Sequence, residues 1–166
     1  MGQRVRISRS MDHMASRAGH PDEVHCDTLS IDPFARLSLA LMRLHFLNFA
    51  EPDRHGWLMA LRVASAHVGP RRAGGLSYDI VAVVQSLRMA RKSTVSFNSE
   101  TCACCRVWLG PDERRLMGLL DAVRHGRMGP ARIMTQLLCD GEQDAALLAS
   151  VADLLTHNAP NFETTT

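Results

Sequence analysis

Residues 32–50 read DPFARLSLALMRLHFLNFA, and this stretch decides the fold class. Asp32 and Pro33 suit the N-cap and the first position of a helix, because the carboxylate accepts from free N–H groups and proline has no N–H to leave unpaired. From residue 34 to residue 50 the sequence is apolar on almost every side of a helix. The two apolar lines are Leu37, Leu41 and Leu44, and Leu39, Met42, Phe46 and Phe49. A helix of this kind is typical of the centre of a domain.

The same apolar spacing, punctuated by Pro, Gly and Asp, predicts further helices along the chain. We expect them over 54–68, 76–92, 111–125, 130–139 and 142–157, with 71–75 as a flexible connection. Between 93 and 109 the helical spacing is lost. Alternation over 94–97 and a return over 105–108 predict a short β-hairpin there.

These elements predict an all-α fold, a compact bundle of five or six helices built from helix hairpins, with that one short β-hairpin around the cysteines. Apolar residues make up 46% of the 166 residues and aromatic residues 5%, a composition that suits helix packing. The expected core is led by Leu41, Leu44, Phe46, Leu61, Val84, Leu120 and Leu137. We also expect Trp57 to point inward and Ile133 to belong to the apolar positions of its helix.

We divide the chain into a flexible basic tail (1–28), one helical domain (29–157) and a disordered tail (158–166). The first segment carries Arg4, Arg6, Arg9 and Arg17 and lacks the apolar stretch of a secretory signal, although a transit peptide is an open alternative. No segment has the roughly 20 apolar residues of a membrane span. We therefore expect a cytoplasmic protein with reduced thiols and no membrane contact.

Cys102-Ala103-Cys104-Cys105 places three of the five cysteines within four residues. Cys102 and Cys105 have the C-x-x-C spacing with which two thiolates bind one zinc ion, and Cys104 can replace either. The candidates to complete the site are His25, Cys26, His125 and Cys139. Two alternatives stay open: a redox pair, and cysteines that are simply small buried apolar residues with no cofactor.

Basic residues suggest contacts with a partner. Arg71, Arg72, Arg88, Arg91 and Lys92 could contact nucleic acid, although a net charge of +2 is small for that role. Arg36 and Arg43 lie one heptad apart on the only polar line of the central helix and could bind an acidic partner. In each case the alternative is a solvated helix surface.

Motifs of common enzymes are absent from the sequence: a Gly-rich phosphate loop, a nucleophile elbow, a zinc-binding His-Glu helix and a kinase signature. We therefore expect a non-enzymatic helical regulatory or adaptor protein that acts through a protein partner. Its central helix has more apolar surface than two helix hairpins cover, which favours a homodimer. The alternatives are a zinc-stabilised DNA-binding transcriptional regulator and, third, a thiol-dependent redox protein.

Overall fold

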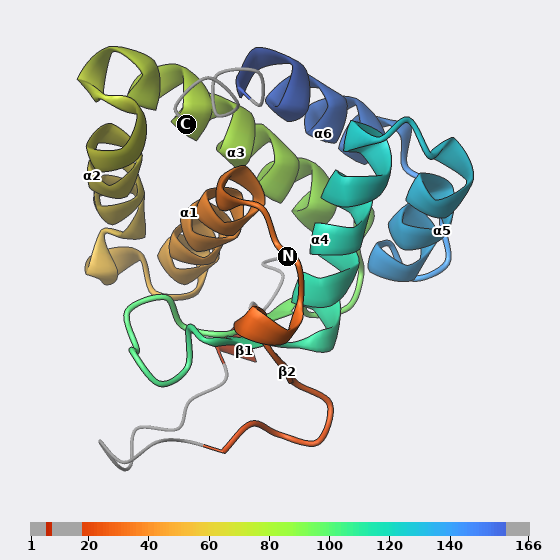
Figure 1. Cartoon of the computed structure of the whole chain (residues 1–166), viewed down its shortest axis with the longest axis horizontal. Helices are drawn as coiled ribbons and strands as arrows, with labels where there is room; N and C mark the ends of the chain where they lie inside the picture. The colour runs from red at the N-terminus through yellow and green to blue at the C-terminus, as the bar shows by residue number, and fades with distance from the viewer. Residues whose placement is uncertain (1–5, 8–17, 159–166) are drawn as a thin grey trace.

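A computed structural model of the chain describes residues 6–7 and 18–158 (Figure 1). Six α-helices occupy most of that part of the chain, which confirms the all-α bundle. They are α1 (Pro33–Ala50), α2 (Gly56–Val68), α3 (Pro70–Ala90), α4 (Pro111–Arg124), α5 (Met128–Leu138) and α6 (Ala145–Asn158). None of the helices described is long and apolar enough to span a membrane.

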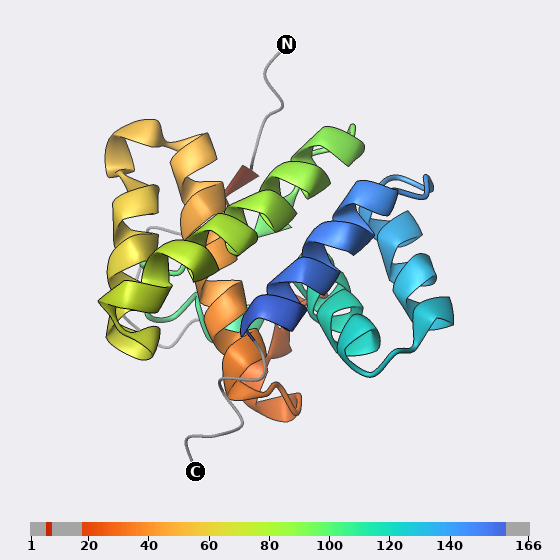
Figure 2. The same cartoon turned by 90° about the horizontal axis from the view of Figure 1, so that it is seen from above.

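Helix α1 is the central element. Its N-cap is Asp32, whose Oδ1 accepts from the N–H of Ala35 at 3.0 Å. The helix packs against α2, α3 and α4, and Figure 2 shows α3 crossing over it. Eleven of its side chains are buried, on all its faces between residues 34 and 47. The apolar character of the sequence on almost every side is thus explained by neighbours on several sides.

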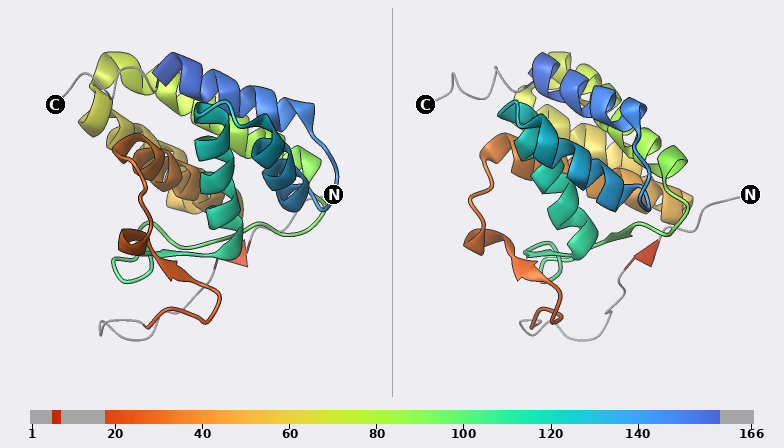
Figure 3. Two further views of the ribbon diagram at one scale, coloured as in Figure 1. Left: turned by 45° about the vertical axis from the view of Figure 1, so that its right-hand side comes forward. Right: turned by 90° about the vertical axis from the view of Figure 1, so that its right-hand side faces the viewer.

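The helices form two packed groups. Helices α1, α2 and α3 contact one another, α4 packs along α5, and α6 joins the groups by lying along α3 (Figures 2 and 3). The turn between α2 and α3 is Gly69 alone, at φ 79°, and Pro70 begins α3. The flexible connection expected over 71–75 is therefore wrong: a left-handed glycine followed by proline starts the next helix at once.

Most of the expected core is confirmed: Leu41, Leu44, Phe46, Val84 and Leu120 are buried, and Leu61 packs against the core while partly exposed. Three expectations are wrong, because Trp57, Ile133 and Leu137 are exposed.

The reason is the choice of face on two helices. Helix α2 packs through small residues, Gly56, Ala60 and Ala64, and a Cβ at Gly56 would lie 2.2 Å from the Leu44 carbonyl oxygen. Such close packing leaves Trp57 outside. Helix α5 buries the narrow stripe of Ala131, Thr135 and Leu138, so its other apolar side chains face away from the core.

Four two-residue strands complete the described structure: β1 (Arg6–Ile7), β2 (Val24–His25), β3 (Ser96–Phe97) and β4 (Trp108–Leu109). Strand β1 pairs with β3 in parallel, and β2 pairs with β4 antiparallel. The hairpin expected within 93–109 is therefore wrong in its pairing: β3 and β4 each bind a strand from the N-terminal part of the chain.

Within the segment expected as a tail, the structure has β2 and a 3-10 turn, Cys26–Thr28. At the other end, α6 extends to Asn158. Arg4, Arg9, Arg17 and residues 159–166 lie outside the described residues. The division into a domain with two tails stays a prediction.

Candidate metal site

The three clustered cysteines lie in the loop that joins β3 to β4, which we call the cysteine loop (98–107). Successive tight turns shape it: the N–H groups of Cys105 and Arg106 donate to the Cys102 carbonyl oxygen at 3.1 and 3.0 Å, and the Trp108 N–H donates to the Cys105 carbonyl oxygen at 3.0 Å. Turns of this kind bring side chains two and three residues apart to the same side of the backbone.

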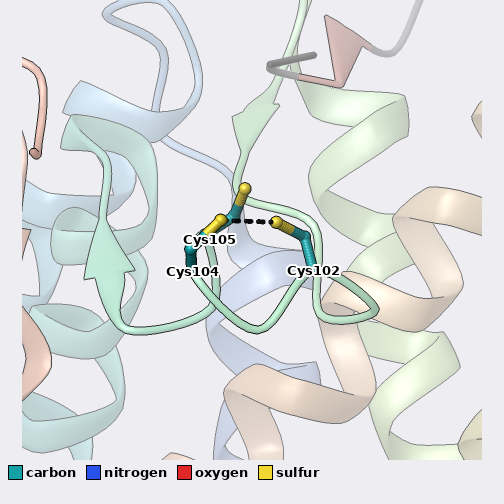
Figure 4. Close-up of side chains that lie close together, drawn as sticks. All are labelled: Cys102, Cys104 and Cys105. Carbon is teal, nitrogen blue, oxygen red and sulfur yellow. Dashed lines mark hydrogen bonds between the residues drawn. The ribbon is translucent and has the colours of Figure 1, made fainter. Parts of the chain in front are cut away.

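The Sγ atoms of Cys102, Cys104 and Cys105 all lie within 4.8 Å of one another, so the group could hold a metal ion. The three side chains converge in Figure 4, where the dashed line joins Cys102 and Cys104, whose sulfur atoms are 3.2 Å apart. Cys105 is buried, while the other two are partly exposed. An ion from solvent would therefore meet Cys102 and Cys104 first.

The three thiols ionise differently. Burial opposes ionisation of Cys102, but hydrogen bonds from the Cys105 and Cys104 thiols outweigh it and lower its pKa. Burial, together with the neighbouring Cys102 thiolate, raises the pKa of Cys105 to about 12. Cys102 is thus the thiol most easily deprotonated in the group, and a thiolate is the form that binds metals.

Arg43 of α1 connects the cysteine loop to the core. Its Nη1 donates to the Arg106 carbonyl oxygen at 2.8 Å and lies 3.2 Å from Oε2 of Glu100, while its Nη2 donates to the Trp108 carbonyl oxygen at 2.7 Å. Glu100 precedes the cysteines, and the two carbonyl groups follow them. One guanidinium group therefore ties both ends of the loop to the central helix.

Glu113 of α4 completes this anchor. Its Oε1 accepts from Arg43 Nε at 2.7 Å and from the Asn98 N–H at 2.9 Å, and its Oε2 accepts from the Gly110 N–H at 2.8 Å. Burial alone would lower the pKa of Arg43, but the carboxylates of Glu113 and Glu100 raise it above its ordinary value. The guanidinium thus stays charged inside the protein.

The candidates for a fourth ligand do not join the group, which among the described residues contains only the three cysteines. Cys26 is buried beside the loop, where its Sγ lies 3.7 Å from the Arg106 carbonyl oxygen. The His25 ring packs edge-on against Trp108. His125 caps α4 near Asp121, and Cys139 is buried at the end of α5, where burial raises its pKa to about 11.

The basic residues expected at a partner surface fall into two sets. Arg43 and Arg91 lie in the interior rather than facing solvent, because buried carboxylates pair with them: Glu113 with Arg43, and Asp112 with Arg91 at 3.0 Å. The others are partly or fully exposed: Arg36, Arg71, Arg72, Arg88 and Lys92. Of these, Arg36 lies 3.5 Å from Asp27. The guanidinium of Arg88 lies over the Phe49 ring, 3.6 Å from its centre.

Sequence reasoning missed Glu100, Glu113 and Asn98, which hold the cysteine loop in place. The only local signal was Glu113 at the third position of α4, where glutamate commonly caps the backbone at a helix start. That signal predicts the helix start but not the bond to Arg43, 70 residues away.

No protein-family model matches the chain, and no curated protein or solved structure matches it either.

Proposed function

We propose that this protein is a non-enzymatic helical regulatory protein whose cysteine loop binds one metal ion through Cys102, Cys104 and Cys105. The observation that carries the proposal is the convergence of three sulfur atoms within 4.8 Å. Thiolate sulfur is a soft ligand and selects soft or borderline ions over magnesium or calcium. Two of the three thiols are partly exposed, which gives an ion access from solvent.

The regulatory part of the proposal rests on how the loop is attached. Arg43 connects both ends of the cysteine loop to the central helix, and the Cys26 N–H donates to the Val107 carbonyl oxygen at 2.8 Å, next to the β2–β4 pair. A bound ion would fix the three cysteines relative to one another. It would therefore change the order of a loop that contacts both the N-terminal segment and the core.

The proposed output is contact with a protein partner. The support is a set of large apolar side chains that the bundle leaves exposed, among them Met128, Ile133 and Leu137 on α5. Aromatic and methionine side chains are common at protein interfaces. Self-association through such surfaces is part of the same proposal.

Loading experiments test the metal site. Reduced full-length protein is dialysed separately against Zn(II), Cu(I) held by a weak chelator, and arsenite, and bound ion per chain is counted by elemental analysis. We expect one ion per chain in the wild type and in the matched control Cys139→Ser, and less than one in Cys102→Ser, Cys104→Ser and Cys105→Ser. No binding of any ion, or equal binding by all variants, would overturn the proposal.

A second experiment tests regulation. Hydrogen exchange is compared between the metal-free and loaded protein. Slower exchange is expected in the cysteine loop, in β2 and around residue 43 of α1, because the ion orders a loop that contacts all three. Protection confined to residues 102–105 would contradict the regulatory role.

DNA binding is the second candidate, since Arg71 and Arg72 are both exposed at the start of α3. Replacing both by glutamine should lower DNA affinity and reduce its salt dependence by about 2 phosphate contacts if the candidate is correct. Affinity for duplex DNA that does not change with salt or with these substitutions would exclude it.

A further inference from the structure

We infer that the ion best matched to Cys102, Cys104 and Cys105 is a trivalent, three-coordinate centre of the arsenite and antimonite class. The inference rests on the metal binding proposed above and specifies its ligand. Three properties of the site carry it: the number of protein ligands, the spacing of the sulfur atoms and the charge around them.

The number of ligands is three. The described part of the chain offers no histidine, cysteine, aspartate or glutamate that joins the group as a fourth member. Structural zinc sites use four protein ligands in a tetrahedron. Trivalent arsenic forms three bonds in a pyramid and carries a lone pair at the fourth position, so three thiolates satisfy it completely.

The spacing favours a narrow pyramid. Tetrahedral zinc with bonds of about 2.3 Å places its sulfur ligands about 3.8 Å apart. Bonds of that length near a right angle, as in pyramidal arsenic, place them about 3.3 Å apart. The Cys102 and Cys104 sulfur atoms are 3.2 Å apart, so they need little movement to bind the pyramidal centre.

The charge around the site favours a trivalent centre. The ionised neighbours are Arg43, Arg106, Glu100 and Glu113, whose charges cancel, and Cys105 is buried. Three thiolates add three negative charges. A trivalent centre neutralises them, whereas Zn(II) leaves one negative charge and Cu(I) leaves two, and an unbalanced charge in a partly buried site is unfavourable.

The exchange is balanced without a redox partner. Arsenite at neutral pH is As(OH)₃, and its reaction with three thiols forms three As–S bonds. Three As–O bonds and three S–H bonds break, and each released hydroxide leaves with one thiol proton as water. Arsenic stays trivalent, so no electrons are transferred and no net charge enters the site.

Competition between arsenite and zinc tests the inference on the full-length reduced protein. Arsenite is titrated into metal-free protein and into protein loaded with zinc. Bound arsenic is counted by native mass spectrometry, and free thiols are counted after unfolding. We expect one arsenic per chain, loss of three free thiols, and displacement of zinc at equal concentrations of the two ions. Cys104→Ser should weaken arsenite binding by more than about tenfold, and Cys139→Ser should bind like the wild type.

Zinc that arsenite does not displace would overturn the inference and leave the proposed metal site standing. Loss of only two thiols, with normal binding by Cys104→Ser, would also overturn it. If neither ion binds, the inference and the proposed function both fail.

Discussion

Nε of Arg43 on α1 lies 2.7 Å from Oε1 of Glu113 on α4, and the two side chains are only 2% and 3% exposed. Both charges are therefore inside the protein, and each depends on the other. The same guanidinium donates to two carbonyl groups that follow the cysteines, so this ion pair links helix packing to the position of the candidate metal site.

Removing Arg43 should destabilise the protein strongly. In Arg43→Met the buried Glu113 carboxylate loses its partner, and we expect a loss of about 3–5 kcal/mol in the free energy of unfolding. The matched control is Arg36→Met on the same helix, because Arg36 is exposed and pairs with exposed Asp27; its loss should be under about 1 kcal/mol. Urea unfolding followed by circular dichroism gives both values. Equal losses would contradict the assigned role of Arg43.

A conservative change at Arg43 should separate loop position from charge. Lysine keeps the positive charge but cannot donate to Glu113 and to both loop carbonyl groups in the same geometry. We expect Arg43→Lys to lower the affinity of the cysteine loop for its ion by about tenfold or more. Arg54→Lys, at an exposed position, serves as the control. The comparison uses conditions in which circular dichroism finds both variants folded, and an unchanged affinity would show that Arg43 does not position the loop.

His45 should make stability depend on pH. It is buried on α1, and burial lowers its pKa from 6.5 to about 4. Below pH 6.5 the unfolded chain binds a proton that the folded state does not, so stability falls as the pH drops towards 4. The loss is about 1.4 kcal/mol per pH unit, or about 3 kcal/mol over this range.

The test compares urea unfolding between pH 7 and pH 4 for the wild type, His45→Gln and the control His125→Gln. The slope should be shallower in His45→Gln alone, because His125 is exposed. A slope that His45→Gln leaves unchanged would assign the acid sensitivity to other groups.

Two adjacent leucines on α5 test the face assignment. Leu138 is fully buried, whereas Leu137 is 48% exposed. We expect Leu138→Ala to lower the free energy of unfolding by about 2–5 kcal/mol and Leu137→Ala by less than about 1 kcal/mol. Thermal and urea unfolding measure both. The reverse order would mean that α5 packs through its other face.

The two leucines also show where sequence reasoning ends. Helix α1 could be predicted because Asp32, Pro33 and the apolar run are local signals. On α5 the apolar spacing of Ile133 and Leu137 suggested an inward stripe, but packing against neighbouring helices uses Ala131 and Thr135 instead. Small residues give a weak apolar signal even where helices pack closely.

The candidate site divides in the same way. Cys102, Cys104 and Cys105 could be grouped from the sequence because tight turns bring near neighbours together. Arg43 could not be assigned to the loop, because its partners Glu100 and Glu113 are 57 and 70 residues away. The placement of Cys139 away from the group likewise depends on tertiary packing rather than on spacing.

X-ray absorption spectroscopy of the loaded full-length protein tests the central claim most directly, because it counts the atoms bonded to the ion. Cys102, Cys104 and Cys105 predict three sulfur neighbours at about 2.3 Å. The count should fall to two sulfur atoms in Cys104→Ser and stay at three in Cys139→Ser. One or no sulfur neighbour in the wild type, or a shell of nitrogen and oxygen alone, would contradict the claim that the three cysteines hold one ion together.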